Sequence, residues 1–236
     1  LKERLARLVP AVRRAMQVLS RYASVMRRLR VARVEAVATS AVRDASNGRA
    51  FVRRVRAQLG IPLRVISGRE EARLAYLGVL QARRTAQPVV IVTIGGGSAQ
   101  VVHGEGLRLR YAASVPLGGA RLAQRFIRHD PPAPEEVEAL RRAAERTWRP
   151  VVRALRRHRW RQALGSSATI SQLIMAAYLR RNRRLPRSKR QCSISRQSLR
   201  ELTAWLAGSA VAERTHLPGL DPKRQDLALP TAVALL

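Results

Sequence analysis

A run of three glycines follows an apolar segment of this sequence and precedes a serine. Gly95, Gly96 and Gly97 come directly after the strand-like residues 89–94, and Ser98 follows them. Glycine lets backbone N–H groups approach an oxyanion with no side chain in the way, and a serine hydroxyl adds a further donor. The pattern indicates a phosphate-binding loop. A plain tight β-hairpin turn is the alternative reading of this segment alone.

Two adjacent glutamates open a predicted helix. Glu70 and Glu71 lie in the segment VISGREEARL, residues 65–74. The positive end of a helix dipole keeps such carboxylates ionised, and an ionised glutamate beside a phosphate can orient and deprotonate a water molecule. Helix-start electrostatics alone is the commoner reason for such a pair, so this segment by itself leaves both interpretations open.

Two more segments have residues that suit phosphate. Arg43 follows a short predicted strand, and an arginine there can bind a phosphate through two parallel hydrogen bonds. Gly165, Ser166 and Ser167 lie between a predicted strand and a predicted helix, which suits a phosphate at a helix N-terminus. The alternatives are a solvated surface charge for the arginine and an ordinary helix cap for the serines.

The charge of the chain is strongly positive. Its 236 residues include 46 Lys and Arg but only 15 Asp and Glu, which gives a formal net charge of +31. All but three of the basic residues are arginine. A GC-rich genome explains this use of arginine in place of lysine, because it encodes arginine wherever a cation is tolerated. The scarcity of acids instead favours a polyanion partner, such as polyphosphate, nucleic acid or an acidic surface.

The composition also limits the class of protein. A hydrophobic content of 46% is that of a globular chain, and the length allows one large domain or two modest ones. The single Cys192 forbids an intramolecular disulfide and fits a reducing compartment. No apolar run approaches the roughly 20 residues that span a bilayer, and the N-terminus lacks the apolar core of a signal peptide. We therefore expect a cytoplasmic protein with no membrane partner.

Hydrophobic periodicity and turn residues predict the elements that position these groups. Helices are expected over residues 1–30, 49–59, 70–81, 118–128, from 134 onward, from 168 to 180, over 195–206 and over 226–236. Strands are expected over residues 34–39, 62–66, 89–94, 100–103, 107–113 and 162–165. The three strands from 89 to 113 form a predicted β-meander, and residues 180–190, with seven cations, a predicted exposed loop.

The order of the segments is more specific than any one of them. ATSAVRDASNG, VISGREEARLAYLGV, IGGGSAQ, SVPLGGARL, GSSATI and LPGL with Arg224 and Asp226 occur in this sequence from start to finish. In this order they resemble the exopolyphosphatase / guanosine-pentaphosphate phosphohydrolase (Ppx/GppA) family over nearly the whole chain. The resemblance implies the actin-like/Hsp70-like ATPase (ribonuclease H-like) fold, which is α/β in two lobes with a cleft between them.

The same resemblance implies boundaries and chemistry. It places a first lobe at residues 1–82, without its first strands and phosphate loop, and a second lobe at 83–236. Family members hydrolyse terminal phosphoanhydrides of polyphosphate, or convert pppGpp to ppGpp, with Mg²⁺ (or Mn²⁺). They often dimerise, although arginine-rich faces would oppose self-association unless anions bridge them.

Residue roles follow from the resemblance position by position. Glu71 matches the glutamate that activates water, and Arg43 matches a phosphate-binding arginine. The second phosphate loop is matched by Gly96, Gly97 and Ser98, and the later small-residue loop of the cleft is matched by Gly165, Ser166 and Ser167.

Several positions depart from the family pattern. Thr93 and Gln100 stand where the family loop has Asp and Glu, and Ala99 and Ala168 replace a Thr and a Gly. Thr93 cannot supply the anionic oxygen that a hard Mg²⁺ ion prefers, and Gln100 keeps the shape of Glu without its charge. No metal ligand is assigned, and the metal site that the family implies is expected to be degraded.

Three functions therefore compete. The first is a phosphohydrolase of polyphosphate or pppGpp with impaired activity, and the second is a non-catalytic protein that binds polyphosphate or a guanosine alarmone. The third is a nucleic-acid binder that uses the basic stretches 149–161 and 180–190. In that case Trp148 and Trp160, beside the first stretch, would stack on bases, although packing in the core is the simpler role for them.

Overall fold

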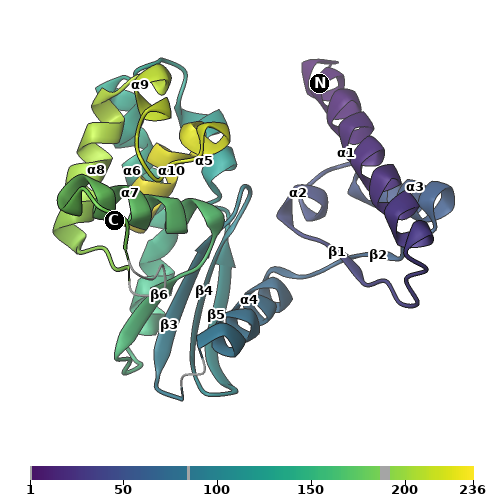
Figure 1. Ribbon diagram of the computed structural model, residues 1–236, viewed down its shortest axis with the longest axis horizontal. Helices are drawn as coiled ribbons and strands as arrows, with labels where there is room; N and C mark the ends of the chain where they lie inside the picture. The colour runs from purple at the N-terminus through teal and green to yellow at the C-terminus, as the bar shows by residue number, and fades with distance from the viewer. Residues whose placement is uncertain (1, 84–85, 187–191) are drawn as a thin grey trace. The chain divides into compact units, whose positions relative to one another are not determined.

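The computed structural model describes residues 2–83, 86–186 and 192–236, with side chains described from residue 10 onward. The chain divides into two compact units, Leu1–Ser67 and Gly68–Leu236 (Figure 1). Among the described helices, none is both long and apolar enough to cross a membrane. The predicted loop over 180–190 begins later than expected, since helix α7 continues to Asn182, and its last residues lie outside the described ranges.

The first unit packs helices beside a two-stranded sheet. Its elements are α1 (Lys2–Arg28), β1 (Ala36–Ala38), α2 (Ser40–Arg43), α3 (Gly48–Leu59) and β2 (Leu63–Val65). The two strands are parallel and pair Ala36 with Leu63. Met16 and Ala23 on α1 pack with Val55 on α3, so the amphipathic pattern of the N-terminal segment forms a helix with one buried face. Gly60 ends α3 in the left-handed region, at φ 67°.

The second unit holds a larger sheet and most of the helices. Its elements are α4 (Gly68–Arg83), β3 (Val89–Ile94), β4 (Ala99–Glu105), β5 (Arg108–Val115), α5 (Gly119–Phe126), α6 (Pro134–Leu155), β6 (Gln162–Gly165), α7 (Ala168–Asn182), α8 (Arg196–Gly208), α9 (Val211–Thr215), the 3-10 helix η2 (Pro222–Arg224) and α10 (Gln225–Leu235). Every strand predicted in this part of the chain is present, and α9 and η2 are additional.

The four strands of this sheet have the order β5-β4-β3-β6. Strands β3, β4 and β5 form the predicted antiparallel meander, and β6 pairs with β3 in parallel, with Val92 beside Gly165. Parallel strands end at the same edge of a sheet. The glycine loop after β3 and the small-residue loop after β6 therefore lie at one edge.

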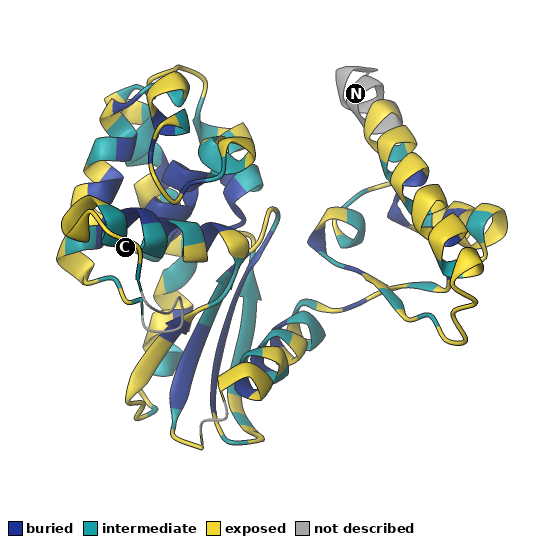
Figure 2. Cartoon of the chain, viewed as in Figure 1, coloured by how far each residue is buried: buried dark blue, intermediate teal, exposed yellow. Residues whose placement is uncertain are grey.

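Helices cover both faces of the sheet. Ala72 and Tyr76 of α4 pack against Ile91 and Val102 on one face. Val151 of α6 packs with Val90 and Val101 on the other face. Figure 2 shows the central strands largely in the dark blue of buried residues.

The packing of α4 explains where the two units divide. The division lies at Ser67/Gly68, and the lobe boundary near residue 82 stays a prediction. Tyr76 is fully buried, and its hydroxyl donates to the carbonyl of Gly106 at 2.8 Å. A Cβ on Gly104 would lie 2.4 Å from that hydroxyl, so glycine at this position lets the helix approach the sheet closely. Helix α4 thus joins the second unit through contacts with its strands.

The largest core lies between the sheet and the C-terminal helices. It includes Leu140 of α6, Leu173 of α7, Leu202 and Leu206 of α8, and Leu229 of α10. Pro230 lies inside α10 without ending it. The indole of Trp148 donates to the carbonyl of Ala234 at 2.8 Å, so this tryptophan joins α6 to α10.

Candidate functional site

The glycine loop closes as a tight turn between β3 and β4. The N–H group of Gly95 donates to the carbonyl of Ser98 at 2.9 Å. The turn therefore has the hairpin geometry that the sequence also allowed. Its carbonyl groups, however, are held in a way that a simple hairpin does not require.

Three successive carbonyls of this loop accept hydrogen bonds from the start of α5. Gly119 N–H donates to Gly95 O at 2.9 Å and Arg121 N–H donates to Gly96 O at 2.9 Å. The Arg121 side chain donates through Nε to Gly97 O at 2.7 Å. All three carbonyls are thus directed toward residues 119–121.

The orientation of the loop N–H groups follows from peptide geometry. In a trans peptide the C=O of one residue and the N–H of the next point in opposite directions. The carbonyls of residues 95–97 face the start of α5, so the N–H groups of Gly96, Gly97 and Ser98 point away from it. Within the described part of the chain, the N–H groups of Gly96 and Gly97 donate to no backbone carbonyl. Successive N–H groups on one side of a loop form a concavity that binds anions.

Glycine at position 118 permits this arrangement. A Cβ on Gly118 would lie 2.3 Å from both Gly96 O and Gly97 N, closer than any real side chain could approach. The peptide between Gly96 and Gly97 thus packs directly against the backbone that precedes α5. The loop and the start of α5 are thus joined by close packing and by three hydrogen bonds.

A row of neutral polar side chains crosses the sheet next to the loop. Thr93, Gln100 and Ser114 are cross-strand neighbours, so they lie on one face, the face that α4 covers. Gln100 is buried and donates through Nε2 to Ser98 Oγ at 2.8 Å and to Ser114 Oγ at 3.3 Å. The buried hydroxyl of Thr93 has no hydrogen-bond partner among the described residues.

These side chains do not fit the divalent cation that the family resemblance implies. Mg²⁺ and Mn²⁺ prefer carboxylate oxygens, and the row of Thr93, Gln100 and Ser114 contains only hydroxyl and amide groups. In the ranges that the structure describes, no group of three or more His, Cys, Asp or Glu side chains could hold a metal ion. The expectation of a degraded metal site stays a prediction.

Glu71 lies in the first turn of α4, next to Glu70. Both side chains are half-buried, and the following Ala72 is fully buried on the sheet. The helix that Glu71 opens covers the sheet face with the neutral polar row. The sequence prediction of a carboxylate pair at a helix N-terminus is confirmed.

The loop after β6 begins beside β3. Ser166 N–H donates to Val92 O at 2.8 Å. Ser167 caps α7, because its hydroxyl accepts from Ile170 N–H at 3.1 Å. A Cβ on Gly165 would lie 2.5 Å from Ile170 Cγ2, so this glycine is required for packing. The cap interpretation thus holds for Ser167, and the loop shares its sheet edge with residues 95–98.

Arg43 belongs to the first unit, whereas the other predicted site residues belong to the second. It ends α2, and its Nη1 donates to Ile66 O at 3.0 Å. Its Nε lies 3.7 Å from Asp44 Oδ1. This guanidinium therefore has protein partners within its own unit.

Sequence reasoning assigned no role to Gly118, Gly119 or Arg121. They occur in the segment SVPLGGARL, which contributed only to the family resemblance. Two glycines followed closely by an arginine at the start of a helix were the available signal. Their role became visible only when α5 was placed against the glycine loop.

Comparison with known proteins gives consistent matches. A sequence profile of the Ppx/GppA phosphatase family matches residues 7–236. An uncharacterised protein of Streptomyces coelicolor is 36% identical over 204 residues, which are 84% of this chain and 59% of that protein. The chain thus spans less than two thirds of the length of this curated relative.

Solved structures share the fold. An exopolyphosphatase from Cytophaga hutchinsonii is 26% identical with a TM-score of 0.81, over 95% of this chain and 73% of that one. A Ppx/GppA family protein from Aquifex aeolicus is 27% identical with a TM-score of 0.73, over 95% of this chain and 72% of that one. The predicted α/β actin-like fold is confirmed.

Proposed function

Because this chain belongs to the Ppx/GppA phosphatase family, we propose that it is an exopolyphosphatase-type phosphohydrolase that releases the terminal phosphate of polyphosphate or pppGpp in the cytoplasm. The observation that carries the proposal is the direction of the loop N–H groups. Three carbonyls of residues 95–97 are tied to the start of α5, which leaves the N–H groups of Gly96, Gly97 and Ser98 directed away from it.

In this proposal the loop binds the oxygens of a phosphate group. Backbone donors that are fixed before the substrate arrives stabilise developing negative charge without reorganisation. The loop of Gly165, Ser166 and Ser167 lies at the same sheet edge and binds a neighbouring phosphate. The family resemblance also assigns phosphate binding to Arg43, and this role stays a prediction.

Glu71 acts on water. It orients a water molecule and accepts its proton as the oxygen attacks the terminal phosphorus. The bond between that phosphorus and the bridging oxygen breaks, and the shortened phosphate chain leaves with the bridging oxygen. No step is assigned to a metal ion, because the neutral row of Thr93, Gln100 and Ser114 does not suit one.

A specific observation favours a second candidate, a non-catalytic protein that binds polyphosphate or a guanosine alarmone. The two positions where the family loop has acids are Thr93 and Gln100, and the Gln100 amide is held by two serine hydroxyls. A loop that binds phosphate but lacks those carboxylates can retain affinity and lose turnover. The nucleic-acid alternative has less support, because Trp148 is anchored to Ala234 and only Trp160 of the pair is exposed.

Phosphate release from long-chain polyphosphate separates the two candidates. The wild-type chain, Glu71→Gln and the matched control Glu70→Gln are compared with Mg²⁺ and with EDTA. We expect release by the wild type, a loss of about a hundredfold or more in Glu71→Gln, and near wild-type release in Glu70→Gln.

The contrary result is a folded wild-type chain that binds polyphosphate and releases no phosphate in either buffer. That outcome would assign the binding function. Equal losses in both glutamate variants would remove the special role of Glu71 and leave only the electrostatics of the helix start.

A further inference from the structure

We propose that the loop of residues 95–98 takes the phosphate chain as a metal-free anion, so that Mg²⁺ weakens binding at this site. The inference rests on the proposed function, because it concerns the same loop and the same class of ligand. It differs from what the family implies, since the family uses a divalent metal.

The side chains beneath the loop are neutral. Gln100 is 4% exposed and its amide nitrogen is shared between the hydroxyls of Ser98 and Ser114. Thr93, its partner on β3, has a buried hydroxyl without a hydrogen-bond partner among the described residues. These groups carry no negative charge, so they offer a hard cation dipolar oxygens in place of carboxylates.

The loop groups that face the ligand are electropositive. The loop presents its N–H groups on the side that faces away from α5. These groups attract an anion in proportion to its charge. A bound Mg²⁺ ion neutralises part of the charge of a phosphate chain and so weakens this attraction.

The metal-free and the magnesium-bound forms of the ligand differ in what they gain at this site. If positions 93 and 100 carried carboxylates, these would supply ligands to the metal of a magnesium–phosphate complex. The same carboxylates would repel a metal-free phosphate anion. With Thr93 and Gln100 the complex gains no carboxylate, and the free anion meets no repulsion. Thr93 and Gln100 therefore make the site favour the metal-free anion over the magnesium–phosphate complex.

The test is isothermal titration calorimetry of the full chain with tripolyphosphate. The titration is done in EDTA and in millimolar MgCl₂ at matched ionic strength. A short chain is chosen because long polyphosphate would also contact the many surface arginines. For the wild type we expect a dissociation constant lower by about threefold or more in EDTA than in MgCl₂.

Two variants assign the effect to this site. Thr93→Asp/Gln100→Glu is expected to bind about tenfold or more weakly in EDTA and to regain affinity when Mg²⁺ is added. Thr93→Val removes only the unbonded hydroxyl. This variant should still bind tripolyphosphate more tightly in EDTA than in MgCl₂. Its melting temperature should be no lower than that of the wild type, because a buried hydroxyl without a partner costs stability. If thermal unfolding shows that the double variant is not folded, Gln100→Glu alone replaces it.

Tighter tripolyphosphate binding by the wild type in MgCl₂ would overturn the inference and leave the proposed function intact. An unchanged metal response in the acidic variants would also overturn it, because the preference would then arise from arginines elsewhere. Failure to bind tripolyphosphate in both buffers would overturn the inference and the proposed function together.

Discussion

The orientation of single residues at the candidate site is set by hydrogen bonds to their neighbours. Gly96 and Gly97 contribute N–H groups whose direction is set by Gly119 and Arg121. Gln100 keeps the shape of the glutamate that the family carries there, yet its amide is used within the protein, between two serine hydroxyls. The replacement of acid by amide is therefore accommodated by the surrounding structure.

His103 provides a test of pH dependence. It lies buried on β4 with Nε2 3.2 Å from Arg159 O, and its ring stacks on His158 at 4.8 Å. Burial lowers the pKa of His103, with smaller contributions in the same direction from His158 and Arg110. Two smaller influences, the Arg159 carbonyl and the Glu105 carboxylate, raise the pKa. The net pKa is below the ordinary value.

The sign of the effect follows from the lowered pKa. The folded chain binds this proton less readily than the unfolded chain. The contribution of neutral His103 to the free energy of unfolding is therefore fully present above a pH of about 6.5, and it declines as the pH falls below that value. Urea unfolding on either side of that pH should show the decline. In His103→Gln the decline should be smaller, and an identical decline would mean that His103 is not its source.

Elements set the geometry that the residues alone do not. Helix α5 lies against the loop of residues 95–98 because Gly118 brings its first turn to the loop backbone. Helix α4 is fixed to the sheet by Tyr76, whose hydroxyl reaches the carbonyl of Gly106. The two helices thereby position the loop and Glu71 within one unit.

Alanine at Gly118 is expected to disturb the junction between α5 and the loop. A Cβ there would meet Gly96 O and Gly97 N at 2.3 Å, so the backbone must shift. We expect a loss of about 1–3 kcal/mol of unfolding free energy and weaker tripolyphosphate binding. Urea unfolding and titration calorimetry measure the two effects.

Gly78→Ala is the matched control. Gly78 lies in α4, and a Cβ there would meet nothing within 4 Å. We expect it to stabilise the chain by about 0.5–1 kcal/mol, because alanine favours helix more than glycine does. Equal behaviour of the two variants would argue against a tight junction at Gly118.

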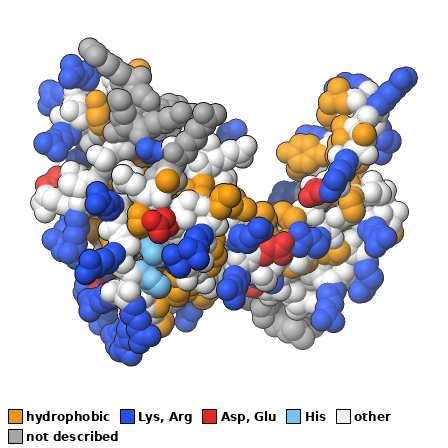
Figure 3. All heavy atoms as spheres, turned by 90° about the horizontal axis from the view of Figure 1, so that it is seen from below, with side chains coloured by type: hydrophobic (Ala, Val, Ile, Leu, Met, Phe, Trp, Pro, Cys, Tyr) orange, Lys and Arg blue, Asp and Glu red, His pale blue; other side chains and the backbone are white. Residues whose placement is uncertain are grey.

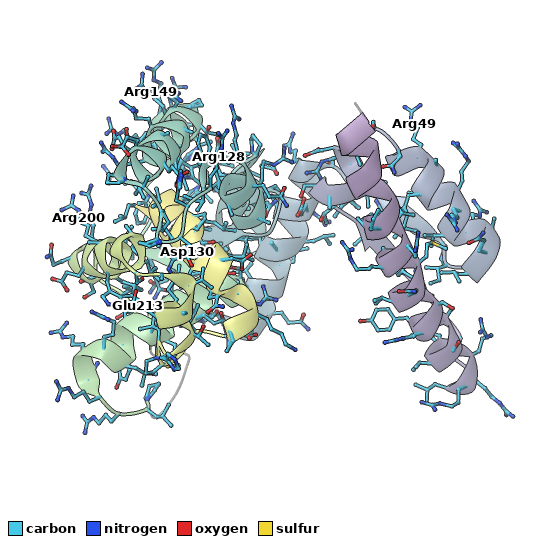
Figure 4. The ribbon with its side chains drawn as sticks, turned by 90° about the horizontal axis from the view of Figure 1, so that it is seen from above. Arg49, Arg128, Asp130, Arg149, Arg200 and Glu213 are labelled. Atoms are coloured by element: carbon cyan, nitrogen blue, oxygen red, sulfur yellow. The ribbon has the colours of Figure 1, made fainter. Side chains whose placement is uncertain are left out.

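At the scale of the whole molecule, positive charge dominates the exposed surface. Blue arginine and lysine side chains are spread over the face drawn in Figure 3, with few red acids among them. In Figure 4 the labelled Arg49, Arg149 and Arg200 project away from the ribbon. Acids such as Asp130 and Glu213 instead accept hydrogen bonds from the backbone N–H groups of Val211 and Ala210.

This charge predicts strong salt dependence of polyanion binding. Release of counterions from long-chain polyphosphate should lower its affinity by about tenfold or more between roughly 50 and 200 mM salt. Tripolyphosphate contacts fewer arginines, so its affinity should change less. Fluorescence anisotropy with labelled ligands measures both, and equal salt slopes would show that long chains bind only at the loop.

The sequence by itself determined the elements, the family and the type of chemistry. Periodicity and turn residues are local properties, so β3, the β-meander and the longer helices were predictable within a few residues, whereas the short α2, α9 and η2 were not. The ordered segments identified the α/β actin-like fold. Tertiary structure alone decided that the carbonyls of Gly95 to Gly97 are tied to α5, that Gln100 lies between two serines and that α4 packs on the sheet of the second unit. These features depend on contacts between segments that are distant in sequence, and no local pattern specifies which groups will meet.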